Sequence, residues 1–118
     1  RRALVEHVAD VLDQRFADPA VLAEGAALFA KNCAPCHSAD GGGLVGPNLT
    51  DAYWIHGGKP ENIVNTVTNG VPEKGMIAWS AMLSPDEIVA VAAHVASLQG
   101  TTPANPKEPQ GDPMPSDG

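Results

Sequence analysis

Apolar residues recur every three or four positions in several stretches of the chain, and this spacing predicts amphipathic helices. The first stretch covers residues 4–16, and the second opens at Asp18 and Pro19 and continues to about Lys31. Asp18 suits an N-cap, and Pro19 suits the first helical position, where an N–H would have no helical partner. The apolar positions of these two predicted helices are Leu4, Val8, Val11, Leu12 and Phe16, followed by Val21, Leu22, Ala26, Leu28 and Phe29.

Two further helices are predicted in the second half of the chain. A short one spans residues 60–69 and stops at Gly70, a residue type that is common just past helix ends. The last one begins with Ser84 as N-cap and Pro85 at the first position, and Glu87 completes a capping box. Its β-branched residues favour strands, but the helical period outweighs that propensity. The apolar positions of this helix, which is expected to reach Gly100, are Ile88, Val91, Ala92, Val95 and Leu98.

The segments between and after these helices are rich in glycine and proline. Residues 39–58 are predicted to form an ordered loop. Residues 101–118 contain too many prolines for a helix, so they form either a solvated linker end or an extended strap on the domain surface. We therefore predict one small all-α domain at residues 18–100, with an N-terminal extension helix at 1–17 and a proline-rich tail at 101–118.

Composition and charge narrow the choice of partners. Only 4% of the 118 residues are aromatic, so the small core would gain from a large, flat apolar cofactor. The formal net charge is −7, and nothing in the chain would neutralise phosphates, so no nucleic-acid partner is expected. A basic or mainly apolar docking surface on a partner suits this charge better, unless the charge serves solubility alone.

The sequence contains no apolar run that approaches the roughly 18 residues of a membrane-spanning helix. The chain starts at Arg1 and shows no signal peptide. We expect membrane association only through an anchor removed upstream or through a partner.

Residues 33–37, Cys-Ala-Pro-Cys-His, carry the strongest chemical signal. They fit half a zinc site, a redox dithiol, a disulfide or a haem-attachment site. Zinc commonly needs a second pair of ligands, and a thioredoxin-like dithiol needs a βαβ context; neither is evident. A Cys33–Cys36 disulfide would close a tiny loop and add little stability. Two thiols on one side of a helical turn suit the two vinyl groups of a haem, and His37 then presents its imidazole to the iron.

Residues downstream supply candidates for the rest of such a site. The loop Gly46-Pro47-Asn48-Leu49 is stiffened by proline, and an iron-bound histidine needs a carbonyl or similar acceptor for its second nitrogen. We expect Pro47 to orient His37 in this way. The other histidines have more ordinary expected roles: His94 packs on the last helix, His56 contacts a haem propionate or lies in a surface loop, and His7 is solvated.

A sixth ligand to the iron is required if the protein only carries electrons, and methionine is the soft candidate. Met76 lies in an irregular segment between helices, free to project inward, and is the preferred ligand. Met82 adjoins Leu83 and is expected to pack in the core, which is the usual role of methionine. Met114 lies in the tail.

Residues 18–100 resemble a class I c-type cytochrome, in which CAPCH, GPNL and a methionine before a tryptophan follow one another between helices. The resemblance implies helices wrapped around one haem c that is covalently held by two thioethers. It also implies that the cofactor contacts Cys33, Cys36, His37, Pro47, Met76 and Trp79, with His37 and Met76 as metal ligands. Gly25 and Phe29 match the family's helix-crossing positions, whereas His94 and Ile77 depart from the family's usual aromatic and proline residues.

The stretches GPNLTDAYWIHGG, GVPEKGMIAW and SLQGTTPANPKEPQG are also similar to the C-terminal cytochrome domain of the dihaem subunit of cbb-type haem–copper oxidases. This likeness implies a monomeric one-electron carrier of a bacterial respiratory chain, without enzymatic activity of its own. It also implies a periplasmic location, soluble or tethered to the outer face of the cytoplasmic membrane, and a respiratory complex or terminal oxidase as partner. The alternatives are a haem-based peroxidase or gas sensor with an open iron site and, more remotely, a metal-stabilised binding module without haem.

Overall fold

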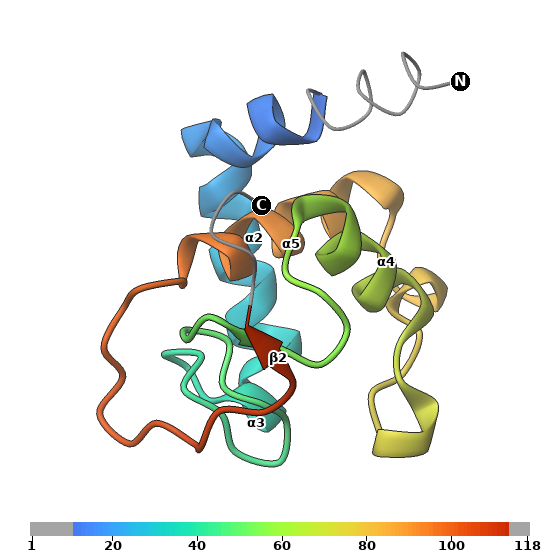
Figure 1. Ribbon diagram of the computed structural model, residues 1–118. Helices are drawn as coiled ribbons and strands as arrows, with labels where there is room; N and C mark the ends of the chain where they lie inside the picture. Colours follow the sequence, from blue (N-terminus) through green and yellow to red (C-terminus); the bar gives the residue numbers. More distant parts are fainter. Residues whose placement is uncertain (1–10, 114–118) are drawn as a thin grey trace.

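A computed structural model describes residues 11–113 and is built mainly of helices around one core (Figure 1). Residues 11–17 are helical, and no helix within the described range is long and apolar enough to cross a membrane. The expected all-α architecture is confirmed, apart from two very short strands. The elements are α2 (Pro19–Asn32), α3 (Ala34–His37), β1 (Tyr53–Trp54), α4 (Pro60–Asn69), the 3₁₀ turns η1 (Pro72–Lys74) and η2 (Trp79–Ala81), α5 (Pro85–Ser97) and β2 (Asp112–Pro113).

Helices α2 and α5 cross at a glycine in the middle of the molecule (Figure 1). A Cβ atom at Gly25 would overlap the backbone carbonyl oxygen of Ala90, so a larger residue there would force the two backbones apart. Phe29 and Val91 lie within four residues of Gly25 and Ala90 in the sequence, and both are almost completely buried. Helix α4 also packs against α5, and the core that the three helices share consists of Phe29, Ile63, Val67, Ile88, Val91, Ala92 and Val95.

The helix starts follow the predicted capping residues. The Asp18 carboxylate accepts a hydrogen bond from the Ala20 N–H at 2.9 Å, and α2 begins at Pro19 as expected. Ser84 and Glu87 form both hydrogen bonds of the predicted capping box, at 2.9 and 3.2 Å. Each capping side chain bonds to a backbone N–H only two or three residues away. The helix starts could therefore be predicted from the sequence without knowledge of the fold.

The N-terminal extension helix is present over residues 11–17, where Phe16 packs against the core. Arg15 forms an ion pair with Asp86 in the first turn of α5, with an N–O distance of 3.0 Å. Both side chains are exposed, so this pair adds little stability. The predictions for Leu4, Val8 and His7 lie outside the described residues.

The proline-rich tail is an extended strap over residues 101–113, which settles the alternative left open above. In Figure 1 it runs from the end of α5 around the long loop to β2. The Gly100 N–H donates to the Thr50 carbonyl at 2.9 Å, and the Lys107 N–H donates to the Gly42 carbonyl at 2.8 Å. Strand β2 then pairs antiparallel with β1 in the long loop. No strand was predicted, because two residues are too few to show a period.

His94 packs against α2, with its ring 5.0 Å from the Phe29 ring, and its Cβ lies close to Gly25 at the crossing. The predicted packing role of His94 is therefore confirmed. The family usually has an aromatic residue at the position of His94. Helices α2 and α5 still pack closely here, because the imidazole lies beside Phe29 in place of that aromatic ring.

Replacing His94 by Phe is expected to remove part of the pH dependence of stability. Burial lowers the pKa of His94 below its ordinary value of 6.5. As the pH falls through about 6.5, the unfolded chain takes up a proton that the folded chain resists, so stability is lost towards acid. Thermal unfolding midpoints of wild type and H94F at about pH 8 and about pH 5.5 measure this difference. The wild type should lose more stability than the variant; equal losses would contradict the prediction.

Candidate haem site

A cavity of about 610 Å³ opens between the helices and the long loop, a size within the range of cofactor sites. The six residues predicted to contact a haem come from separate parts of the chain, and all of them line this cavity: Cys33, Cys36, His37, Pro47, Met76 and Trp79. Its inner wall is the hydrophobic core itself, namely Phe29, Ile63, Val67, Val71, Val91 and Val95. The cavity therefore suits a large apolar body with a small number of polar attachments.

The two cysteines are both free thiols in the cavity wall. Cys33 is the N-cap of α3, and Cys36 lies within that single helical turn. Burial, together with the nearby Cys36, raises the pKa of the Cys33 thiol to about 11. A redox dithiol needs a lowered thiol pKa, so this environment disfavours the dithiol reading. Two thiols in one turn at an apolar wall are instead suited to thioether bonds.

His37, the last residue of α3, is held by the loop that follows it. Its Nδ1 lies 2.9 Å from the carbonyl oxygen of Pro47. A carbonyl can only accept, so Nδ1 donates the hydrogen and Nε2 keeps a free lone pair. Burial lowers the pKa of His37, which favours the neutral imidazole. The result is a neutral, oriented ligand of the kind that a haem iron binds.

Gly46 allows the loop to lie directly against the His37 ring. A Cβ at this position would lie 2.5 Å from Cε1 of His37, too close for any other residue without displacement. Two backbone hydrogen bonds tie the loop to α3: the Gly46 N–H donates to Cys36 at 2.7 Å, and the Gly43 N–H donates to His37 at 2.9 Å. The loop thus fixes the position of the Pro47 carbonyl relative to the imidazole.

Met76 is half-buried, contacts the core and lines the cavity. Its backbone is less irregular than expected, because it pairs with Val71 through two hydrogen bonds of 2.8 and 3.1 Å. Between them lie η1 and Gly75, whose φ of 90° is a left-handed conformation that favours glycine. Trp79, at the start of η2, is packed against the same core. The turn thus presents Met76 to the cavity from a fixed backbone.

Met82 does not have the role expected of it. Its side chain is 66% exposed and is not among the residues that line the cavity, so the prediction that it packs in the core is wrong. Leu83 alone is half-buried against the core, because η2 ends there and turns Met82 outward. Met114 lies outside the described residues.

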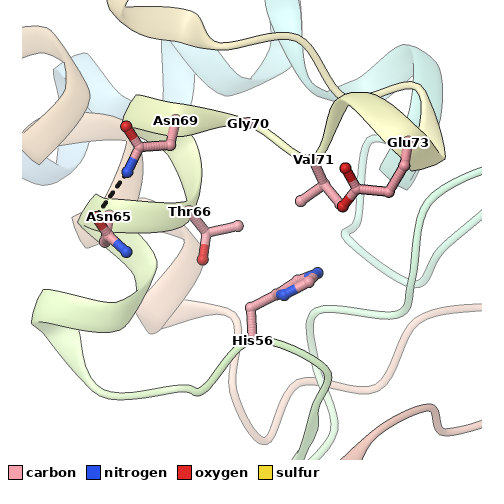
Figure 2. A pocket seen from close by; sticks show the side chains of 7 residues that line it. All are labelled: His56, Asn65, Thr66, Asn69, Gly70, Val71 and Glu73. Carbon is pink, nitrogen blue, oxygen red and sulfur yellow. Dashed lines mark hydrogen bonds between the residues drawn. The ribbon is translucent and has the colours of Figure 1, made fainter.

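A polar chamber of about 270 Å³ adjoins the large cavity (Figure 2). Figure 2 shows the His56 ring across the space from Val71 and Glu73, with Thr66 pointing toward it from α4. His56, Thr66, Val71 and Glu73 line both spaces, so the two adjoin. His56 lies in an exposed loop and also lines both spaces, so contact with a haem propionate stays a prediction beside the surface-loop role.

Trp54 is a site residue that sequence reasoning missed. Its indole Nε1–H is buried and finds no hydrogen-bond acceptor within the described residues, although Trp54 lines the cavity. A buried N–H without a partner costs free energy, so it points to an acceptor supplied by a bound group. The ring lies against the backbone of Gly58, where a Cβ would approach Nε1 to 2.5 Å. The only feature of the sequence that could have indicated Trp54 as a site residue is that a tryptophan lies in a glycine-rich loop.

The residues present fit a haem c. Its flat macrocycle matches the apolar wall, its vinyl groups match two thiols in one turn, and its propionates would supply an acceptor for the unpaired indole N–H of Trp54. A neutral imidazole and a thioether on separate elements complete the donor set. A structural zinc site, by contrast, would require four protein ligands.

Comparison with known proteins agrees with this geometry. The sequence profile of the family described as cytochrome C oxidase, cbb3-type, subunit III matches residues 20–95. The chain belongs to this family. The resemblance to cytochromes of cbb-type oxidases, inferred from the stretches GPNLTDAYWIHGG, GVPEKGMIAW and SLQGTTPANPKEPQG, is thereby confirmed.

Two curated relatives show how the family match extends along the chain. The cbb3-type cytochrome c oxidase subunit FixP of Azorhizobium caulinodans is 36% identical, over 89% of this chain and 45% of the relative. Subunit CcoP of Rubrivivax gelatinosus is 44% identical, over 70% of this chain and 28% of the relative. The chain thus spans less than half the length of these family members.

A solved structure supports the fold independently. Cytochrome CL from the marine methylotroph Methylophaga aminisulfidivorans superimposes with a TM-score of 0.66 and 27% sequence identity, over 71% of this chain and 57% of that one. The class I cytochrome c fold predicted for this family member is therefore confirmed.

Proposed function

We propose that the chain is a one-electron carrier of a bacterial respiratory chain, with a single haem c as its redox centre. The observation that carries this proposal is the convergence of Cys33, Cys36, His37 and Met76 on the walls of one apolar cavity. A bound haem c supplies an iron that gains and loses one electron without making or breaking bonds to a substrate. The role of the protein chain is to hold the iron and to provide the apolar environment of the haem.

Each site residue has a separate task in this proposal. Cys33 and Cys36 would tether the haem, and His37 and Met76 would bind its iron. The Pro47 carbonyl keeps Nδ1 of His37 occupied, so that Nε2 faces the iron. Trp79 packs on the cofactor, and the indole N–H of Trp54 donates to a propionate. With both ligands supplied by the chain, the iron would change its oxidation state with little rearrangement.

The proposed partner and location are supported by the relatives, which are subunits of cbb3-type oxidases. We propose a terminal haem–copper oxidase or another respiratory complex as partner, and the periplasm as location, either soluble or tethered to the outer face of the cytoplasmic membrane. The chain acts as a monomer and is not itself an enzyme. Residues 18–100 form the haem domain, with 1–17 as an N-terminal extension and 101–118 as a tail.

The visible spectrum of the reduced protein before and after addition of carbon monoxide tests this function. We expect the narrow bands of low-spin haem c, unchanged by the gas, because Met76 occupies the sixth position. A shifted Soret band in the wild type would show that a small molecule reaches the iron. The peroxidase or gas-sensor alternative would then replace the electron-carrier proposal.

A further inference from the structure

The strap over residues 101–113 is bound to the loop that holds His37. The Lys107 N–H donates to the Gly42 carbonyl at 2.8 Å, and the strap lies so close that a Cβ at Gly42 would meet Pro103 and one at Gly43 would meet Lys107. A proline-rich segment is stiff and has few N–H groups that can donate hydrogen bonds. The bond donated by the Lys107 N–H is therefore an important attachment of the strap to the loop. Lys107 thus lies at the centre of the contact between strap and loop.

Asn48 connects this contact to the interior. Its side chain is buried, and its Oδ1 accepts from both the N–H and the hydroxyl of Thr50, at 2.8 and 2.7 Å. Its Nδ2 donates to the carbonyl oxygen of Lys107 at 3.2 Å. Asn48 directly follows Pro47, whose carbonyl accepts from His37. The main chain of Lys107 is therefore joined to the orienting loop through a buried amide.

The side chain of Lys107 extends the same contact to the cavity. Its Nζ donates to the carbonyl oxygen of Val45 at 3.3 Å, and both residues line the cavity. Val45 precedes Gly46, which lies against the His37 ring. Glu73 and Lys74, the other charged residues of the lining, come from η1 instead.

We propose that the strap holds Lys107 close to His37 and the haem, where the positive charge of its ammonium favours the reduced state of the haem. The proposal rests on the proposed haem function. Reduction adds one negative charge to the haem, and a nearby fixed cation lowers the free energy of the state with more negative charge. Lys107 is half-buried as a residue, and its ammonium is bonded to the Val45 carbonyl at the surface, so the charge is held in place more firmly than that of a free surface lysine.

Three variants of the haem-loaded full chain separate this effect from a structural one. Lys107→Met removes the charge and keeps most of the side chain, Lys107→Arg keeps the charge, and Lys31→Met removes a charge from an exposed site on α2. Both Lys107 variants retain the main-chain bonds to Gly42 and Asn48. Amide hydrogen exchange at residue 107 checks that the strap remains bound.

Spectroelectrochemical titration of these variants gives the deciding result. At a fixed applied potential, Lys107→Met is expected to lower the ratio of reduced to oxidised haem about two- to tenfold. Lys107→Arg should restore most of that ratio, and Lys31→Met should change it much less. The difference between Lys107→Met and wild type should shrink as salt is added.

Two results would overturn the inference and leave the electron-carrier function intact. One is an unchanged ratio in Lys107→Met with a native low-spin spectrum and a protected strap. The other is an equal loss in Lys107→Arg, which would assign the effect to side-chain geometry rather than charge. Failure of the proposed function has a different signature, because the wild type itself would then lack low-spin haem c or bind carbon monoxide.

Discussion

Replacing both Cys33 and Cys36 by Ala is expected to yield a chain that is mostly unfolded and free of haem. The two thioether bonds are the proposed tether, and without them the cofactor is lost during preparation. The inner wall of the cavity is the hydrophobic core, including Phe29 and Val91, so an empty cavity exposes the centre of the fold.

The lining of the cavity indicates why the effect is large. A cavity of about 610 Å³ whose inner wall is the core leaves apolar side chains without packing partners or in contact with water when no cofactor fills it. Both conditions cost free energy, and a whole domain is stabilised by only about 5–15 kcal/mol.

Far-UV circular dichroism and thermal unfolding of the purified double variant measure the outcome. Cys33→Ala alone and Cys36→Ala alone serve as matched controls, because each keeps one thioether and should remain helical with haem bound. A double variant that is helical, cooperative in unfolding and free of haem would refute the prediction. It would show that the helices close over the cavity without the cofactor.

The parts of the fold that could be predicted depend on short-range signals. Asp18 and the Ser84–Glu87 pair bond to N–H groups two or three residues away, and the apolar periods of α2, α4 and α5 each lie within one element. Gly25 was assigned to the helix crossing by family resemblance, and the structure supplies the physical reason in its approach to Ala90.

The parts that could not be predicted depend on contacts between distant residues. The strap bonds to residues about 60 positions away, as in the 3.2 Å bond from Asn48 to Lys107, and no local pattern encodes such a partner. The exposure of Met82 depends on where η2 ends, and a methionine beside Leu83 carries no mark of that. Trp54 was recognisable as a large residue in a loop, but its unpaired N–H is visible only in three dimensions.

The candidate site could be predicted where its reactive and ligating residues are neighbours in the sequence. CAPCH places two thiols and an imidazole within five residues, and all three line the cavity. The choice of Met76 over Met82 rested on segment context, and the structure adds the Val71 pairing and the left-handed Gly75 that fix its backbone. The close approach of Gly46 to His37 had no sequence signal beyond the glycine itself.

Replacing Met76 by Ala is expected to lower the reduction potential and to open the iron to small molecules. Methionine is a soft ligand that favours ferrous iron, and alanine offers no donor atom. The fall should be on the order of 0.1 V, a fraction of the roughly 0.8 V range over which axial ligands set haem potentials. Because the backbone of residue 76 is held by its pairing with Val71, the turn should keep its shape in the variant.

Met82→Ala is the matched control, since it removes the same side chain from an exposed position outside the cavity lining. Carbon monoxide should shift the Soret band of reduced Met76→Ala and leave that of Met82→Ala unchanged. The potential of Met82→Ala should equal that of the wild type. The reverse pattern would move the ligand to Met82, and this would require the segment after η2 to turn inward when haem is bound. A native spectrum in both variants would instead show that neither methionine binds the iron, so that the sixth ligand comes from elsewhere in the chain.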